Sequence, residues 1–215
     1  MATSKGKMTF DDGREYEGEF ENGKFHGQGV LRFADGGRYE GLFENGDYKE
    51  GKFFYKSGAV YEGGFKNNKR EGKGKFVYSS GSVYEGNFVN DARDGIGKIV
   101  YKSGDVYAGE WQNDECKGFG VYKFADGGIY QGQFANGKLN GMGKMTYADG
   151  SVYEGNWKDN KKVPYDYMWP DGSYYMGPMM DGVPSGIGTR HYPDGRVVKG
   201  LWQKGYFVYA ERDTD

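Results

Sequence analysis

The sequence predicts an all-β protein: an elongated, twisted and curved single antiparallel sheet of stacked β-hairpins. Three observations predict this fold class. Forty of the 215 residues are glycine and 18% are aromatic, one sequence cluster recurs with a fixed period, and the segments between glycine turns alternate apolar and polar residues. The glycine content argues against helices, because each interior glycine costs about 1 kcal/mol relative to alanine. The aromatic content argues against a disordered chain.

The repeat begins with a cluster of the form aromatic-x-Gly-x-aromatic, such as YEGEF at Tyr16. A half unit precedes it, because GKMTFDDG at 6–13 matches GKFVYSSG at 74–81. A period of this length is typical of repeat arrays, so we predict one continuous array over 1–205 and a C-terminal tail over 206–215. The clusters begin 22 or 23 residues apart, at Tyr16, Tyr39, Tyr61, Tyr84, Tyr107, Tyr130 and Tyr153, with degenerate copies at Tyr175 and Val198.

Each unit is predicted to form one β-hairpin. In its first segment Tyr16, Gly18 and Phe20 alternate with glutamates, which is the period of a strand with one aromatic and one polar face. The Asn22-Gly23 turn that follows is a strong hairpin signal, because both central residues accept a positive φ. The second segment carries a Gly-x-Gly pair and alternating apolar residues, and it ends at a second turn that usually contains glycine.

A single hairpin buries too little apolar surface to be stable alone, so each unit depends on its neighbours. The rings of successive units are therefore expected to stack, which makes the molecule a rod. The free edge strands at the two ends of such a rod invite pairing with another chain. Homo-association through the array ends is therefore a further expectation.

The repeat is irregular in two places. The second unit is one residue short and keeps only Gly51 of its glycine pair. The second place is 161–185, which contains Pro164, Pro170, Pro178 and Pro184. Proline removes ladder donors and methionine suits adaptable contact surfaces, so we interpret this stretch as a kink, as a partner contact patch, or as the decaying end of the array. The candidate contact residues are Met168, Trp169, Met176, Met179 and Met180.

Stacking aligns the first-segment rings of successive units in two columns. A single-layer sheet has no second layer to cover its aromatic face, and contiguous exposed aromatic area usually marks an interaction site. Two such columns on a curved sheet form a trough for an extended or helical peptide segment of a protein partner. The alternative is that the rings only hold the rod together. The predicted groove is lined by Tyr39, Phe43, Tyr61, Phe65, Tyr84, Phe88, Tyr107, Trp111, Tyr130, Phe134, Tyr153 and Trp157.

The combination of Tyr-Glu-Gly-x-Phe/Trp, Asn-Gly, Gly-x-Gly and Asp-Gly at a 23-residue period resembles the MORN repeat (membrane occupation and recognition nexus) over about 6–205. The resemblance implies a curved antiparallel sheet with a groove lined by the repeat aromatics. It also implies an adaptor or scaffold role in the cytoskeleton, in cilia and axonemes or at membranes, and binding to anionic lipid. We therefore expect a non-catalytic, protein-binding scaffold that is cytoplasmic and associated with the cytoskeleton or a cilium.

Two alternatives stay open. One is a regulatory subunit of a separate enzyme, since arrays of this family also occur fused to kinase or methyltransferase domains. The other is a peripheral membrane module that binds anionic phospholipids such as phosphoinositides, because positions 49–75 carry eight basic and three acidic residues. The candidate lipid patch consists of Lys66, Lys69, Arg70, Lys73 and Lys75.

The sequence contains no recognisable catalytic or metal-binding constellation. His26 and His191 lie in different units and Cys116 has no neighbouring histidine, which argues against a catalytic triad and a histidine-rich metal site. No Walker, GxGxxG or GxSxG motif occurs. The 29 basic and 31 acidic residues give no reason to expect nonspecific nucleic-acid binding. We expect no enzymatic activity, cofactor or metal, and no signal peptide or membrane span, because no long apolar run occurs.

Overall fold

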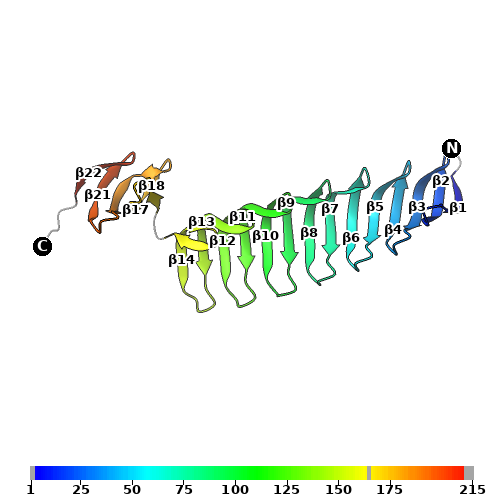
Figure 1. Cartoon of the computed structure of the whole chain (residues 1–215), viewed down its shortest axis with the longest axis horizontal. Coiled ribbons are helices and arrows are strands. Elements are labelled where there is room, and N and C mark those ends of the chain that lie inside the picture. Colours follow the sequence, from blue (N-terminus) through cyan, green and yellow to red (C-terminus); the bar gives the residue numbers. More distant parts are fainter. Residues whose placement is uncertain (1–2, 164–165, 211–215) are drawn as a thin grey trace.

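The computed structural model describes residues 3–163 and 166–210, and the regular elements of these residues are all β-strands. The first fifteen strands form one antiparallel sheet in chain order, with each strand hydrogen-bonded to the next (Figure 1). The prediction of an elongated all-β array of consecutive hairpins is confirmed. The strands are β1 Ser4–Thr9, β2 Glu15–Glu21, β3 Lys24–Arg32, β4 Arg38–Glu44, β5 Asp47–Phe54, β6 Val60–Lys66, β7 Lys69–Val77, β8 Val83–Val89, β9 Ala92–Val100, β10 Val106–Gln112, β11 Glu115–Lys123, β12 Ile129–Ala135, β13 Lys138–Thr146, β14 Val152–Lys158 and β15 Lys161–Val163.

The tight turns that join the two strands of each hairpin have the backbone conformation that the sequence predicts. Asn22 and Gly23 have φ values of 50° and 74°, and a positive φ at both central residues suits the right-handed twist of the flanking strands. Other units place Asn90-Asp91 at the same turn, with φ values of 48° and 74°. Asparagine and aspartate tolerate this left-handed conformation, so glycine is not required at the second turn position.

A row of paired glycines crosses the fifteen-stranded sheet. Gly97 is the partner of Gly109, and Gly109 is the partner of Gly120. The side of the sheet that bears Tyr107 and its equivalents is called the aromatic face here, and the other side is called the back face. On the aromatic face the Tyr107 ring lies across the glycine row, because a Cβ added to Gly109 would lie 2.7 Å from the Tyr107 hydroxyl. The bare Cα therefore makes room for the ring, as the sequence pattern suggests.

The tyrosine hydroxyl of each regular unit makes the same hydrogen bond. Tyr84 donates to the backbone carbonyl of Asn87 at 3.0 Å, and Tyr130 donates to that of Gln133 at 3.0 Å. The acceptor always lies three residues along the same strand, where a bulge interrupts the ladder after the glycine. The hydroxyl thus satisfies a carbonyl at the bulge, which phenylalanine could not do. This bond explains why the first ring of the cluster is tyrosine.

Replacing Tyr84 by phenylalanine is expected to lower the free energy of unfolding by about 1–2 kcal/mol, because the Asn87 carbonyl loses its buried donor. Tyr175→Phe is the matched control. The Tyr175 hydroxyl is equally buried but makes no hydrogen bond with any described residue, and the carbonyl of Pro178, three residues along, accepts the Ser185 amide instead. Urea unfolding should give a change below about 0.5 kcal/mol for the control. Equal losses for the two variants would contradict this role of the hydroxyl.

The core of the array is a continuous chain of edge-to-face rings on the aromatic face. Tyr84 contacts Phe88 of its own unit at a centroid distance of 5.1 Å and Trp111 of the next unit at 5.3 Å. Tyr107 repeats the pattern, with Trp111 at 5.2 Å and Phe134 at 4.9 Å. Each tyrosine therefore joins two units, and edge-to-face pairs are a favourable ring arrangement. This linkage confirms that neighbouring hairpins share their rings.

The ladder of the first sheet ends at β15, inside the irregular stretch 161–185. Within the described residues, the strands after it form a five-stranded sheet in the order β16-β17-β20-β21-β22 and a two-stranded sheet of β18 and β19. Pro164 lies outside the described residues. Pro178 has no amide hydrogen for a ladder, and β17 ends at Met176, shortly before it. The strands are β16 Tyr167–Met168, β17 Tyr174–Met176, β18 Met179–Met180, β19 Val183–Pro184, β20 Gly186–His191, β21 Val197–Gln203 and β22 Tyr206–Ala210.

Part of the segment that the sequence analysis assigned to a tail is a strand. Residues 206–210 form β22, which pairs with β21. The reason is that YFVYA is a run of aromatic and β-branched residues that follows a turn at Lys204 and Gly205, both with positive φ. Residues 211–215 lie outside the described part of the chain.

Candidate protein-binding site

The residues predicted to line a groove form the buried floor of the aromatic face. The tyrosines from Tyr39 to Tyr130 are 0% exposed, and their phenylalanine and tryptophan partners are also buried. Tyr153, near the end of the sheet, is half-buried. The floor is covered because second-strand and turn rings pack over it, so the predicted columns are not the outermost surface of this face. The buried groove residues are Tyr39, Phe43, Tyr61, Phe65, Tyr84, Phe88, Tyr107, Trp111, Tyr130, Phe134 and Trp157.

A second set of aromatic side chains, which the sequence analysis did not single out, reaches the surface of the same face. Each of these rings immediately precedes a turn between hairpins, and each is half-buried against the core. The signal was present in the sequence, because an aromatic residue recurs at this place every 22 or 23 residues. The rings that a partner could touch are therefore mainly Phe33, Tyr55, Tyr78, Tyr101, Phe124 and Tyr147.

One further position decides how completely the floor is covered. It lies early in the second strand, opposite the second ring of the cluster, and its occupants along the array are Phe25, Tyr48, Arg70, Arg93, Cys116, Leu139 and Lys162. Arg93 lies over Trp111 at 4.1 Å from the ring centroid, and it is fixed by Asp114 at 2.8 Å. Cys116 and Leu139 are shorter than the rings and arginines before them. The aromatic face is therefore less filled over the last third of the sheet.

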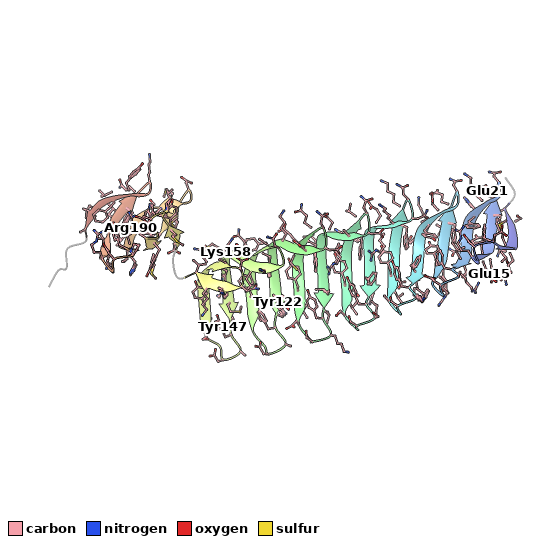
Figure 2. The ribbon with its side chains drawn as sticks, viewed as in Figure 1. Glu15, Glu21, Tyr122, Tyr147, Lys158 and Arg190 are labelled. Atoms are coloured by element: carbon pink, nitrogen blue, oxygen red, sulfur yellow. The ribbon has the colours of Figure 1, made fainter. Side chains whose placement is uncertain are left out.

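An open hollow of about 570 Å³ lies there, between β11 and the end of the fifteen-stranded sheet. Tyr122 and Tyr147, which line it, are labelled in Figure 2. The hollow, called the aromatic hollow below, combines a buried apolar floor with half-buried rings and a polar rim. The Lys162 ammonium lies 4.8 Å from the centroids of both Tyr147 and Tyr153. The aromatic hollow is lined by Tyr122, Phe124, Phe134, Gly137, Leu139, Met145, Tyr147, Trp157, Asn160 and Lys162.

Burial raises the pKa values of groups around the aromatic hollow. It raises the pKa of Tyr101 to about 12 and the pKa of Tyr122 above its ordinary value. Both hydroxyls, which are neutral at physiological pH even at the ordinary pKa of tyrosine, therefore stay neutral in more alkaline solution as well. Nearby Cys116 is buried, and the same desolvation raises the pKa of its thiol to about 11.

Cys116 is consequently expected to react slowly with thiol reagents in the folded protein. A raised pKa means that the thiol stays protonated at pH 8, whereas an ordinary thiol is partly ionised there, so ionisation alone slows alkylation by about 200-fold. Mass spectrometry of iodoacetamide labelling checks this, with the rate in denaturant as the reference. The rate in the folded state should keep rising with pH up to about pH 11, whereas an ordinary thiol is almost fully ionised by about pH 10. A rate that is constant from about pH 10 upwards would contradict a raised pKa.

The irregular contact patch is divided between two faces. Met168 and Met176 are exposed, and both belong to the face opposite Tyr175, because Met168 pairs with Tyr174. Trp169 instead packs towards Trp202, at 5.6 Å, on the aromatic side, with the Arg190 guanidinium 3.8 Å above its ring. Met179 and Met180 lie in β18, where Met180 is exposed and Met179 is half-buried. Trp169 therefore has a structural role, and the four methionines are the remaining candidates.

The candidate lipid patch is also divided. Arg70 lies on the aromatic face opposite Phe65 and pairs with Asp91 at 3.1 Å. Lys66, Lys69, Lys73 and Lys75 share the back face. On that face Lys75 pairs with Glu85 at 2.8 Å. The carboxylates between these lysines reduce the net positive charge that the sequence count indicates.

Among residues 3–163 and 166–210, no group of three or more histidine, cysteine, aspartate or glutamate residues is placed to hold a metal ion. These residues also include no helix that could span a membrane.

Comparisons with known proteins agree with the repeat architecture. The model of the MORN repeat family matches seven segments that together cover more than half of the chain: 16–38, 61–83, 84–106, 107–129, 130–152, 153–163 and 175–195. The unmatched second unit is the shortened one. A search of curated protein sequences gives no significant match.

Two similar solved structures are TCP-type domains in complex with peptides. One is the TCP domain of Drosophila melanogaster SAS-4 (dCPAP) with a proline-rich motif of Ana2, at 12% identity, with coverage of 92% of this chain and 90% of that chain and a TM-score of 0.40. The other is the TCP10 domain of Danio rerio CPAP with a STIL peptide, at 14% identity, with coverage of 92% and 84% and a TM-score of 0.36. TM-scores below 0.5 carry nothing over to the partners of this chain. The matches to the family model, together with the stacked hairpins and their shared rings, show that the chain belongs to the MORN-repeat family.

Proposed function

We propose that this protein is a non-catalytic scaffold that holds a peptide segment of a protein partner in the aromatic hollow. The observation that carries the proposal is the open hollow itself, where half-buried rings above a buried apolar floor remain accessible on a single-layer sheet. Contiguous accessible aromatic surface of this kind is typical of interaction sites. Aromatic rings also supply large contact area at low conformational cost.

The lining indicates what the occupant offers. Its apolar side chains pack against Tyr122, Phe124 and Tyr147, while the floor keeps its shape because the Trp157 indole donates to the Gly143 carbonyl at 3.2 Å. The rim adds polar groups, since the Asn160 side chain is held by the Leu139 amide at 2.8 Å and Lys162 carries a positive charge. An extended or helical segment with apolar anchors and a nearby carboxylate fits this lining.

Tyr147→Ser is the variant that tests the proposal, and Tyr78→Ser is its matched control. Both tyrosines precede a turn and both are half-buried, but only Tyr147 lines the aromatic hollow. The immobilised wild-type chain and the two variants are used to capture proteins from extract, after thermal melts have shown that all three are folded. Overlapping peptides of a captured protein then locate the bound segment by fluorescence anisotropy.

We expect one segment to bind the wild type and the Tyr78 control equally, and to bind the Tyr147 variant at least about 10-fold more weakly, as for an interface anchor. Equal binding by all three proteins would refute the site. A fourth chain, in which Met168, Met176 and Met180 are replaced by serine and Lys162 is kept, tests the irregular stretch separately. If this chain binds the segment more weakly while Tyr147→Ser also weakens binding, the exposed methionines belong to the contact surface.

The proposed setting is a cytoskeletal or ciliary assembly, an expectation that rests on family membership alone, and localisation of the tagged chain tests it. The membrane alternative has weaker support, because Arg70 is engaged with Asp91 on the aromatic face. Flotation with phosphoinositide liposomes would decide that alternative, with co-flotation at physiological salt favouring it. The structure offers no observation that favours the enzyme-subunit alternative.

A further inference from the structure

β14 has a paired strand along only part of its outer side. The three residues of β15 pair with 156–158, but β14 begins four residues before them, at Val152. In the preceding unit, the pairing of β12 with β13 continues to Ile129, the equivalent of Val152. Among the described residues, no strand pairs with 152–155 on the side away from β13. These four residues are called the open edge here.

The open edge also lacks the cover that a second strand provides elsewhere. Val152 is 55% exposed, and Tyr153 is half-buried, whereas the equivalent tyrosines of the preceding units are 0% exposed. A Cβ added to Gly132 would lie 2.5 Å from the Cα of Gly143 in the paired strand. A Cβ added to Gly155 would meet, among the described residues, atoms of the Tyr153 side chain alone. The glycine partner of a regular unit is therefore missing here in the described chain.

The open edge directs backbone groups outwards at alternate residues. Hydrogen-bonded pairs alternate along an antiparallel ladder, and the Tyr147 amide donates to the Ser151 carbonyl at 2.8 Å in the turn between β13 and β14. Counting in twos from Ser151 assigns the backbone groups of Tyr153, and of the glycine two residues farther, to β13. The amides and carbonyls of Val152 and Glu154 therefore point to the open side, where a further strand can bind them.

The residues of this chain that would continue along the open edge do not suit it. Trp169 occupies the same turn position as Tyr147, because the amide of each donates to the carbonyl four residues ahead. Counting back three residues from Trp169 places Asp166 opposite Glu154. Like charges directly opposite each other destabilise strand pairing. Asp166 instead accepts the Gly177 amide at 2.8 Å, and the strand that follows it, β16, pairs with β17.

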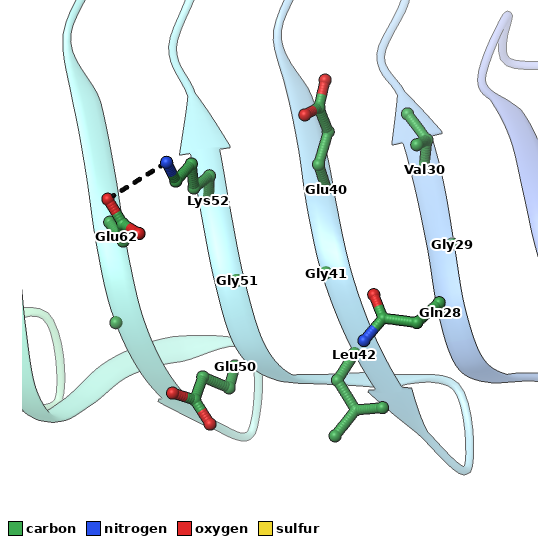
Figure 3. A pocket seen from close by; sticks show the side chains of 11 residues that line it. Gln28, Gly29, Val30, Glu40, Gly41, Leu42, Glu50, Gly51, Lys52 and Glu62 are labelled. Atoms are coloured by element: carbon green, nitrogen blue, oxygen red, sulfur yellow. Dashed lines mark ion pairs between the residues drawn. The ribbon is translucent and has the colours of Figure 1, made fainter.

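The regular units show which residues suit such an edge. Figure 3 shows the back face over β3–β6, where Lys52 and Glu62 lie beside the glycine row and form an ion pair at 3.3 Å. In the strand on its other side, Glu62 is opposite Lys75. This glutamate therefore has a lysine in both neighbouring strands. Its equivalent in the open edge, Glu154, has Lys144 opposite on β13 and, in the described chain, no residue opposite on the other side.

The two positions beside this one follow equally regular rules. The tyrosine before it is opposite a large apolar or aromatic side chain, as Tyr130 is opposite Met145. The glycine after it is opposite another glycine, as Gly132 is opposite Gly143. A strand that reads glycine, basic residue, large apolar residue therefore suits the open edge in the antiparallel orientation.

The other charged groups of this region are compatible with a basic residue opposite Glu154. Lys162 lies on the aromatic face, over two tyrosine rings, whereas Glu154 belongs to the back face. Lys158 and its partner Lys161 share the back face, but Lys158 lies four residues along β14, about 13 Å away at 3.3 Å per residue. This distance exceeds the roughly 8 Å over which salt screens exposed charges. Asp166 lies 3.5 Å from a β14 side chain and adds a second negative charge.

We propose that the open edge is a second docking surface, and that its occupant is an extended segment of a protein partner that adds a strand antiparallel to β14. The segment places glycine opposite Gly155, a basic residue opposite Glu154 and a large apolar residue opposite Tyr153. Main-chain hydrogen bonds give such strand addition its affinity, and alternate side chains give its specificity. None of these three residues lines the aromatic hollow, so the two surfaces can be tested separately.

A second copy of this chain offers similar residues but fits less well. Positions 6–8 of β1 are glycine, lysine and methionine, and the outer side of β1 has no partner among the described residues. The two residues before them would lie opposite 156–157, where β15 already pairs. They cannot bend away, because β2 pairs with β1 from Ser4 onwards. A partner segment that enters at its glycine avoids this overlap.

Hydrogen exchange of the free chain, followed by NMR, tests the open edge itself. The amides of Val152 and Glu154 should exchange at least about 100-fold faster than those of Val106 and Ala108. Val106 and Ala108 occupy the same repeat positions in β10, where β11 pairs with them. Equal protection of the four amides would show that the edge is already covered, and would overturn the proposal.

The probe for binding is the synthetic peptide Gly-Lys-Met-Thr-Tyr, which repeats the sequence of 143–147 and begins at its glycine. Two control peptides carry glutamate in place of the lysine or valine in place of the glycine. Each is titrated into the full chain and followed through the backbone amide signals. Glu154→Lys reverses the charge of the open edge, and Gln131→Lys is the matched variant, because Gln131 occupies the same repeat position in β12, which has a paired strand on both sides.

We expect the lysine peptide to slow hydrogen exchange at Val152 and Glu154. The wild type and Gln131→Lys should bind it at least about 3-fold more tightly than the glutamate peptide, and Glu154→Lys should invert this preference. The valine peptide should bind the wild type at least about 10-fold more weakly, because its side chain would meet the Tyr153 ring, as a Cβ added to Gly143 would meet the ring of Tyr130.

Absence of binding by the lysine peptide, or equal binding by the three peptides, would overturn the proposal. Sedimentation equilibrium covers the remaining occupant. A wild-type dimer that Glu154→Lys dissociates and Gln131→Lys leaves intact would assign the open edge to β1 of a second copy instead of to a different protein.

Discussion

Replacing Trp111 by alanine is expected to lower the free energy of unfolding by about 4 kcal/mol. The indole is 4% exposed, touches the rings of Tyr84 and Tyr107 at 5.3 and 5.2 Å, and donates to the Gly97 carbonyl at 3.1 Å. Its loss opens a cavity at the joint between two units and leaves a buried acceptor unpaired. Urea unfolding measures the change.

Trp111→Phe is the control, because phenylalanine fills the same position in other units, at Phe88 and Phe134. It should cost only about 1 kcal/mol, for the lost indole hydrogen bond and volume. Since each unit contacts only its neighbours, hydrogen exchange should show lost protection in β9–β12 and unchanged protection in β1–β4. A uniform loss of protection along the whole array would show that the effect of the substitution is not confined to neighbouring units.

Gly109→Ala is expected to cost about 3 kcal/mol although it adds a single methyl group. The new Cβ would lie 2.6 Å from the Cα of Gly120 and 2.7 Å from the Tyr107 hydroxyl. One of these neighbours is backbone in the paired strand and cannot rotate away. The strands must therefore separate or the tyrosine must leave its place on the glycine row.

Gly137→Asp provides the comparison for this prediction. Gly137 has a φ of 71° and no atom within 4 Å of an added Cβ, and the equivalent turn position in another unit is Asp91, at 74°. The free energy of unfolding should change by less than about 0.5 kcal/mol. Thermal melts of the two variants check both values, and a tolerated Gly109→Ala would mean that the ring does not lie across the glycine row.

The hairpins and their turns could be predicted from the sequence because they depend on local rules. Alternation around Gly18 predicts the strand, and Asn22-Gly23 predicts the turn, with the observed positive φ at both residues. Recurrence of the same cluster predicts that neighbouring hairpins pair. The MORN family assignment follows from the same residues, which is why it is confirmed by the family model.

The candidate site could be predicted only in part, because it depends on contacts between units. The sequence indicates an aromatic face, but it does not indicate that Tyr107 is covered while Tyr147 is accessible. That difference arises from strand pairing, which packs second-strand and turn rings over the first-strand rings, and these contacts become known only when the strands are paired. The irregular stretch that begins at 161 can be recognised in the sequence. The sequence does not indicate that the first sheet ends there, at β15, and that the following strands form separate sheets.

Small-angle X-ray scattering of the full chain tests the central claim most directly, because stacking hairpins in a single layer makes the molecule long. The fifteen-stranded sheet alone extends about 67 Å at about 4.8 Å per strand, so the maximum dimension must exceed this value. The radius of gyration must likewise exceed the roughly 17 Å of a compact domain of this length. A radius of gyration near 17 Å with a shorter maximum dimension would contradict an open array whose aromatic face is available to a partner.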